Sequence, residues 1–225
     1  MKLLLDHPKV CVALFEAVHE GLPWNALNPE DLQAAARTLG WNGKVRSALQ
    51  VHGERILEPH ETGDADGFFL EAGQAGLVRH ADCFPVVVAD PEKSLAVVLH
   101  CGWRGCALHL ARQGVQRLLR AGSRPTNLIA AIGPGIGASD FEVGPEVLAN
   151  FPAAVHTHTS RGTPSIDLPA YLVQELDAAG VSRTRITCDL RSTLGDLNLH
   201  SHRRDGSRSG RMATFCTVSP YDGVP

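Results

Sequence analysis

The sequence predicts a mixed α/β fold in which a mixed β-sheet is layered with helices. Two stretches, residues 81–89 and 95–105, each contain an apolar run typical of a buried strand. After the second run, apolar residues recur at helical spacing, and strand-like and helix-like segments follow in the rest of the chain. The 225 residues contain no repeat and no low-complexity linker, so we expect one domain over residues 1–225.

In the first half of the chain, residues 29–39 are expected to form a helix. Asn28 is a suitable N-cap, and the apolar residues of the segment are three and four positions apart. Residues 45–52 favour a strand that ends in His52. An apolar stripe then runs from Gly105 to Gly122 and predicts one long helix that stops at the second glycine.

In the second half, strands and helices again succeed one another. Asp167 is placed to cap a helix from its N-terminal side. The predicted segments are a strand at 128–132, a glycine-dependent turn at 133–137, a short helix at 145–151, a helix at 168–179, a strand at 185–188, a polar stretch at 200–211 and a closing strand at 212–218.

Charge and composition favour a small-molecule partner. The net charge of −3 and the pI near 6.4 do not attract nucleic acid or an anionic membrane. No apolar run is long enough to cross a bilayer, and Asp6 and Pro8 interrupt the leading apolar residues before a signal-peptide core is complete. The six cysteines are widely spread, which favours reduced thiols and a cytoplasmic location. The sequence does not indicate an oligomeric state.

Three metal-binding side chains lie at the ends of separate predicted strands. Taken singly, Cys83 is explained as a small buried hydrophobic residue, and His52 or His100 as a histidine that caps a carbonyl. Together they can converge at one rim of a twisted sheet. Two imidazoles and a thiolate make a three-ligand zinc set, which leaves a fourth position open for water or substrate.

Basic residues near this rim are candidates for anion binding. Gly102 and Arg104 lie where a strand passes into a helix, and the amides of a helix start can hold phosphate. The alternative is a tight turn with Trp103 in the core. Arg203 and Arg204 belong to a basic run that is either a solvated surface or a phosphate clamp.

Five motifs occur in one order along residues 45–218. They are 81–85 (ADCFP), 100–105 (HCGWRG), 132–137 (IGPGIG), 141–144 (FEVG) and 201–206 (SHRRDG) with 210–212 (GRM). With these motifs the chain resembles the YfiH/laccase-domain family, also described as polyphenol oxidase-like. Residues 50–52 (QVH) and 64–66 (DAD) resemble two further elements of that family.

The resemblance implies an α/β/β/α-type fold and zinc bound by His52, Cys83 and His100. It also implies a purine nucleoside enzyme that carries out phosphorolysis of adenosine, inosine and methylthioadenosine and deamination of adenosine. Residues 1–44 diverge from the family, whose N-terminal element is shortened here to something like residues 24–28 (WNALN). A zinc-deaminase signature with Pro-Cys-x-x-Cys is absent from the sequence.

The leading hypothesis is therefore zinc-dependent purine nucleoside chemistry with a nucleoside and phosphate as partners. Cys83, Arg104 and Asp82 are the candidate catalytic residues. Gly102 and Arg203 or Arg204 are the candidates that bind phosphate or substrate.

Three alternatives stay open. In the first, Cys83 is the nucleophile and His100 the base of an amide hydrolase that acts on a cell-wall precursor. In the second, the metal is copper and the protein oxidises phenols, although a cysteine with two distant histidines is not enough to hold a trinuclear copper cluster. In the third, zinc only stabilises a binding module, and Cys101 or Cys188 supplies a fourth ligand.

Overall fold

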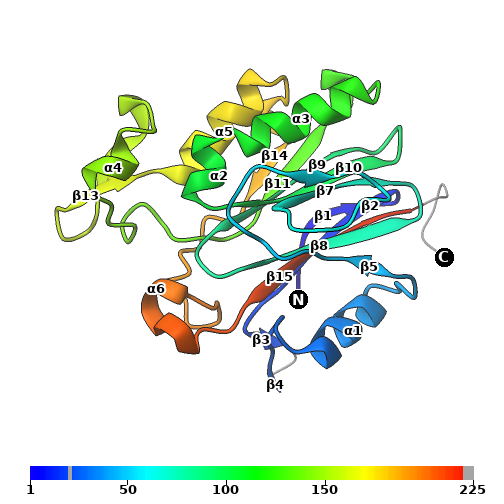
Figure 1. Ribbon diagram of the computed structural model, residues 1–225, viewed down its shortest axis with the longest axis horizontal. Coiled ribbons are helices and arrows are strands. Elements are labelled where there is room, and N and C mark those ends of the chain that lie inside the picture. Colours follow the sequence, from blue (N-terminus) through cyan, green and yellow to red (C-terminus); the bar gives the residue numbers. More distant parts are fainter. Residues whose placement is uncertain (20–21, 220–225) are drawn as a thin grey trace.

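The computed structural model describes residues 1–19 and 22–219, and it has four layers. Two β-sheets pack face to face. Helices α2 (Trp103–Ala107), α3 (Leu110–Arg120) and α5 (Leu168–Ala178) cover the outer face of one sheet, and α1 (Pro29–Thr38) covers the outer face of the other (Figure 1). Three apolar clusters fill the spaces between these layers, one between the sheets and one under each helical layer. The predicted mixed α/β class and the α/β/β/α layering are confirmed.

The larger sheet has six strands, in the spatial order β14-β11-β9-β10-β7-β6. Its strands are β6 (Ile56–Leu57), β7 (Gly67–Glu71), β9 (Phe84–Asp90), β10 (Leu95–Cys101), β11 (Ile129–Ile132) and β14 (Ile186–Cys188). The antiparallel pair β9 and β10 lies at its centre, with His100 opposite Pro85. Helices cover one face of this pair and the second sheet covers the other, which explains why both strands are almost entirely apolar.

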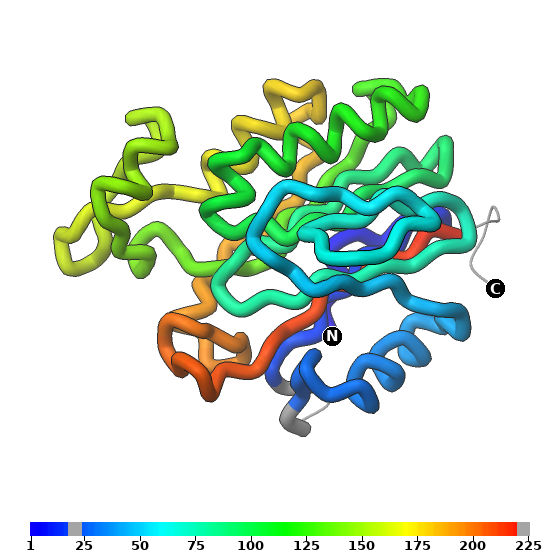
Figure 2. The backbone as a smooth tube through the Cα atoms, in the orientation of Figure 1, coloured from blue at the N-terminus to red at the C-terminus, as the bar shows by residue number. Residues whose placement is uncertain are grey.

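The smaller sheet has five strands, in the order β1-β2-β15-β8-β5. Its strands are β1 (Lys2–His7), β2 (Val10–Phe15), β5 (Val45–Arg46), β8 (Gln74–His80) and β15 (Met212–Val218). The N-terminal strand β2 pairs with β15 near the other end of the chain (Figure 2). The hairpin of β1 and β2 was not predicted, because Asp6 and Pro8 interrupt its short leading apolar run. Two minor hairpins are β3 (Val18–His19) with β4 (Leu22–Pro23) and β12 (His156–His158) with β13 (Pro164–Ile166).

The helices predicted at 29–39, 145–151 and 168–179 form near those bounds, whereas α6 (His202–Asp205) lies in the stretch predicted only as polar. The described helices are α1 (Pro29–Thr38), α2 (Trp103–Ala107), α3 (Leu110–Arg120), α4 (Pro145–Leu148), α5 (Leu168–Ala178) and α6 (His202–Asp205). The Asn28 side chain accepts a hydrogen bond from the Glu30 amide at the start of α1, and Asp167 accepts one from the Ala170 amide at the start of α5. Within the described residues, no helix is both long enough and apolar enough to span a membrane.

Two predicted elements were wrong. The single helix from Gly105 to Gly122 is broken into α2 and α3, because His109 adopts a left-handed conformation with φ 59°. A tertiary contact holds this break, since Nδ1 of His109 lies 3.0 Å from a carboxylate oxygen of Glu175 on α5. The strand predicted at 45–52 ends at Arg46, and the following residues form a loop.

Candidate active site

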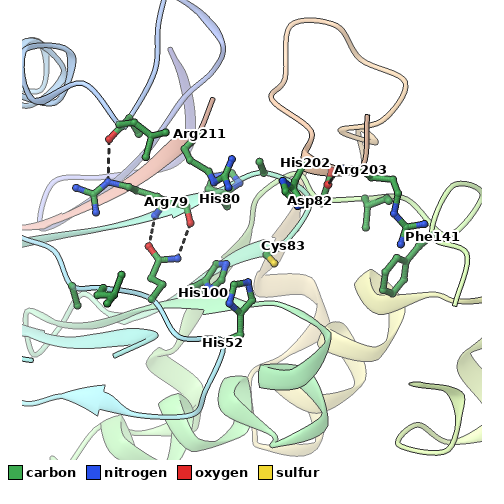
Figure 3. Close-up of a pocket in the computed structure, with 17 residues that line it drawn as sticks. His52, Arg79, His80, Asp82, Cys83, His100, Phe141, His202, Arg203 and Arg211 are labelled. Atoms are coloured by element: carbon green, nitrogen blue, oxygen red, sulfur yellow. Dashed lines mark hydrogen bonds between the residues drawn. The ribbon is translucent and has the colours of Figure 1, made fainter. Parts of the chain in front are cut away.

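A pocket of about 600 Å³ opens where one end of the six-stranded sheet meets the five-stranded sheet. Its floor contains His52, Cys83 and His100, whose side chains point toward one another (Figure 3). Cys83 directly precedes β9, and His100 lies in the neighbouring antiparallel strand β10 at the same end of the sheet. The three predicted metal ligands are therefore brought together.

The three donor atoms lie within 4.8 Å of one another, a spacing that one metal ion can bridge. The imidazole rings of His52 and His100 meet edge to face, with centroids 4.9 Å apart. Neither Cys101 nor Cys188 belongs to this cluster, so it offers three protein ligands. Across residues 1–19 and 22–219 no second group of at least three such side chains converges in this way.

Asp66 positions both histidines of the cluster. Its carboxylate lies 2.9 Å from Nδ1 of His100, so a protonated Nδ1 donates to it and leaves Nε2 free as a metal ligand. The same carboxylate accepts the backbone amides of His52 at 3.0 Å and Gly53 at 2.7 Å. These bonds curl the loop and place His52 at φ 60°, which is why this segment cannot continue as a strand.

The opposite charges of Cys83 and His100 stabilise each other and shift the pKa of both groups. Burial alone would raise the pKa of the Cys83 thiol, but His100 and His52 outweigh it and lower that pKa to about 6. Burial alone would lower the pKa of His100, but Cys83 and Asp66 outweigh it and raise that pKa to about 9. Without a metal, the cluster is therefore a thiolate beside an imidazolium at neutral pH.

Gly102 leaves room for the cluster. A Cβ atom at this position would lie 2.9 Å from Sγ of Cys83 and 3.2 Å from Cδ2 of His52. Its φ of −73° and ψ of 172° are accessible to any residue, so the requirement for glycine is steric. Gly102 thus shapes the cluster by lacking a side chain, whereas the sequence suggested an anion-binding turn.

Asp82 and Arg203 lie on one side of the pocket, beside Phe141 (Figure 3). Asp82 has φ 85°, and its carboxylate accepts hydrogen bonds from the Thr193 hydroxyl and the Arg203 backbone amide, both at 2.6 Å. The Arg203 guanidinium lies over the Phe141 ring, 5.8 Å from the ring centroid, and reaches the Glu142 carbonyl. Asp82 therefore anchors the segment that presents Arg203 to the pocket.

Arg104 and Arg204 lie outside the lining of this pocket. The Arg104 guanidinium stacks on Trp103, 4.4 Å from the ring centroid. The Arg204 guanidinium donates to the carbonyls of Thr193 and Leu199 and to the Asp205 carboxylate. The structure does not bring either arginine to the cluster, because packing and backbone carbonyls occupy them.

The pocket also contains residues that sequence reasoning missed or left without a role. Arg79 and His80 line it from β8 of the five-stranded sheet, and Arg211 lines it from the position directly before β15. Nε2 of His80 lies 3.0 Å from the Thr214 hydroxyl. Burial, with His100 and His200 adding to it, lowers the pKa of His80 to about 3, so this imidazole is neutral. Strand β8, which carries two of these residues, was not among the predicted elements.

The divergent N-terminal part reaches the pocket as well. Ala26 and Leu27 belong to its lining, together with Leu49 from the loop that precedes His52. Leu27 is 59% exposed and Leu49 is 68% exposed, so they form an apolar rim at the pocket mouth. Only their tertiary position distinguishes these leucines from other surface leucines, and no local pattern marks them.

Solved structures with the same fold include three bacterial proteins. The hypothetical protein YfiH of Bacillus licheniformis has a TM-score of 0.83 at 24% identity, with 96% of this chain and 99% of that chain covered. YlmD from Geobacillus stearothermophilus also has a TM-score of 0.83, at 25% identity over 94% and 92% of the two chains. NMB0706 of Neisseria meningitidis has a TM-score of 0.79 at 26% identity over 94% and 95%.

Relatives in sequence carry the names of nucleoside enzymes. A purine nucleoside phosphorylase of Deinococcus radiodurans is 31% identical over 84% of this chain and 81% of its own length. One of Mycobacterium bovis is 34% identical over 74% and 69%. An adenosine deaminase named RL5, from an unknown prokaryotic organism, is 35% identical over 61% and 55%. The family model described as multi-copper polyphenol oxidoreductase laccase matches residues 28–219, and the chain therefore belongs to this laccase-like family.

Proposed function

We propose that this protein is a zinc-dependent purine nucleoside enzyme that cleaves the glycosidic bond of adenosine, inosine or methylthioadenosine with phosphate. The observation that carries the proposal is the cluster of His52, Cys83 and His100 at the floor of a nucleoside-sized pocket. The names of the relatives in Deinococcus and Mycobacterium support the reaction class.

The donor set fits zinc. One thiolate and two imidazoles are ligands that zinc prefers, and a carboxylate behind a ligating histidine is the usual second contact. When bound, zinc supplies Lewis-acid polarisation of a substrate or water oxygen at its open position. Copper is the alternative that the family name suggests, but one three-residue cluster in the described chain offers too few ligands for a multicopper centre.

The residues around the cluster provide separate surfaces for the purine base and for an anion. Leu27, Leu49 and Phe141 offer apolar surface for the purine base. Arg203 offers a positive charge for an anion on the side of Asp82. In phosphorolysis an oxygen of phosphate bonds to C1′ of the ribose, the C1′–N9 bond breaks, and the purine takes up one proton. Deamination of adenosine, suggested by the relative RL5, is proposed as a second reaction of the same site.

One observation favours a second candidate function. The lowered pKa of Cys83 and the imidazoles beside it match the nucleophile and base of a cysteine amide hydrolase. In that function the Cys83 thiolate forms a thioester with the carbonyl carbon, the C–N bond breaks, and the amine leaves with a proton from His100. Water then cleaves the thioester, which releases the acid and returns a proton to His100. This candidate needs no metal, so metal content distinguishes it from the first.

The deciding experiment compares wild type with Cys83→Ala, Cys83→Ser and the control Cys188→Ala, a half-buried cysteine outside the cluster. Mass spectrometry measures bound metal, and chromatography resolves the products of adenosine with phosphate. About one zinc per chain in wild type and Cys188→Ala, with zinc and adenine formation lost in Cys83→Ala, would support the proposal. Metal-free wild type that cleaves an amide, with both Cys83 variants inactive, would contradict it in favour of the hydrolase.

A further inference from the structure

Arginine side chains in the pocket lack acidic partners. Arg79, Arg203 and Arg211 all belong to its lining. The arginine ion pairs formed by residues 1–19 and 22–219 involve other arginines, all of them outside this pocket. The acidic residue in the lining, Asp82, already accepts from Thr193 and from the Arg203 amide. Nη1 of Arg211 donates to the carbonyls of Ser209 at 3.0 Å and Gly210 at 2.9 Å, and its Nε and Nη2 have no partner among the described residues. Guanidinium groups without paired carboxylates in a concave site favour an anionic ligand.

Arg79 and Arg211 belong together in the fold. Arg79 lies opposite Ala213 in the antiparallel pair of β8 and β15, and Arg211 precedes Ala213 by two residues. Arg211 directly precedes β15, so the two arginines lie on neighbouring segments at the pocket end of the sheet. The backbone of Ala26 joins them, since its carbonyl accepts from Nε of Arg79 at 3.0 Å and its amide donates to the Arg211 carbonyl at 2.8 Å.

The backbone at Arg79 is rigidly held. The side-chain amide of Gln50 donates to the Arg79 carbonyl at 2.7 Å and accepts from the Arg79 amide at 2.8 Å. Gln50 also precedes His52 by two residues, so one loop supports both Arg79 and the cluster. The terminal nitrogens of Arg79 have no hydrogen-bond partner among the described residues, and burial lowers its pKa without an opposing carboxylate. A half-buried cation with free donors is therefore fixed at the pocket wall.

We propose that Arg79 and Arg211 form a phosphate-binding subsite on the side of the pocket away from Arg203 and Phe141 (Figure 3). The inference deepens the proposed function and rests on it for the identity of the substrate. The bound group is a phosphate, which is either the inorganic co-substrate or the 5′-phosphate of a purine nucleotide. Both sources offer oxygens that two guanidinium groups can bind together.

The test measures binding without turnover. Isothermal titration calorimetry of inorganic phosphate and, separately, of adenosine 5′-monophosphate is carried out on wild type, Arg79→Gln and Arg79→Lys. Arg124→Gln is the matched control, because it removes the same charge from an exposed site outside the pocket. Circular dichroism melting curves verify that each variant is folded. We expect Arg79→Gln to weaken binding about tenfold or more, with Arg79→Lys intermediate.

The two titrations distinguish inorganic phosphate from the 5′-phosphate of a nucleotide as the bound group. If Arg79→Gln binds inorganic phosphate more weakly than wild type, the subsite is assigned to the co-substrate. If only the nucleotide binds more weakly, the subsite is assigned to a phosphate carried by the substrate. Binding of both ligands that is unchanged in Arg79→Gln, or lowered equally in Arg124→Gln, would overturn the subsite. Phosphate binding that depends on Arg79 in a protein with no phosphorolysis would keep the subsite and refute the proposed function instead.

Discussion

The two sheets contribute different kinds of chemistry to one pocket. The six-stranded sheet supplies Cys83 and His100, short side chains at the end of its central strands, backed by the buried carboxylate of Asp66. The five-stranded sheet supplies Arg79 and Arg211, long side chains at its edge of the pocket.

The difference follows from what each ligand demands. A metal requires donor atoms at fixed distances, which short side chains on a buried strand pair can hold. An anion accepts a wider range of donor positions, so long guanidinium side chains anchored at the sheet can bind it.

Replacing Asp66 should have the largest effect on metal binding, because its carboxylate positions both histidines of the cluster. Asp66→Asn puts an amide nitrogen against the donors of His100, His52 or Gly53, so we expect zinc affinity to fall about 10- to 100-fold. The free energy of unfolding should also fall by about 1–3 kcal/mol. Competition with a chromophoric chelator measures the first effect, and urea unfolding the second. Asp64→Asn, an exposed neighbour, is the control, and equal zinc affinity in both variants would refute the role of Asp66.

The contact between the two sheets should depend on pH through Asp189. Burial alone would raise the pKa of Asp189, but Arg191 and Lys2 of β1 outweigh it and lower that pKa from 3.8 to about 2. A lowered pKa stabilises the folded state above pH 4, and this contribution disappears as the pH falls toward 2. We expect Asp189→Asn to cost about 2 kcal/mol at pH 7 and clearly less at pH 3 in urea unfolding.

The control for Asp189 is Asp177→Asn, which breaks an exposed pair with Arg183. This variant should change the free energy of unfolding by less than about 1 kcal/mol at pH 7. A loss in Asp189→Asn that is the same at pH 7 and pH 3 would show that charge does not tie β1 to the segment after β14.

Adding one methyl group at Gly102 tests how tightly the cluster is built. In Gly102→Ala the new Cβ meets Cys83 and His52, so we expect zinc affinity and turnover to fall about tenfold. The backbone conformation tolerates alanine, and the thermal midpoint of the metal-free protein should change little. Gly195→Ala, where a Cβ meets nothing within 4 Å, serves as control. Wild-type zinc affinity in Gly102→Ala would show that the cluster can accommodate an additional methyl group.

The smallest effect is expected at the apolar rim. Leu49→Ser removes apolar surface from the pocket mouth, so KM for adenosine should rise about two- to threefold with kcat unchanged. Leu197→Ser, at a leucine that is 78% exposed and outside the pocket, controls for a general surface change. Steady-state kinetics compare the two variants. An equal KM in both would show that the apolar rim does not contribute to substrate binding.

Much of the fold was predictable because its signals are local. The caps at Asn28 and Asp167 and the strand at 212–218 follow from short patterns and agree with the structure. Cys83 and His100 were identifiable for the same reason, since each lies at an end of a continuous apolar strand. The break at His109 was not, because a contact with Glu175, 66 residues away in sequence, stabilises it.

The chemistry of the cluster was thus determined by the sequence itself, through residue types at the ends of two adjacent buried strands. The tertiary structure decided which distant groups join it. His52 reaches Cys83 only because Asp66 curls its loop, and Arg79 faces the pocket only because β8 pairs with β15 in a second sheet. Local periodicity defines the face of each strand, but it carries no information on which strands pair or which sheets pack together.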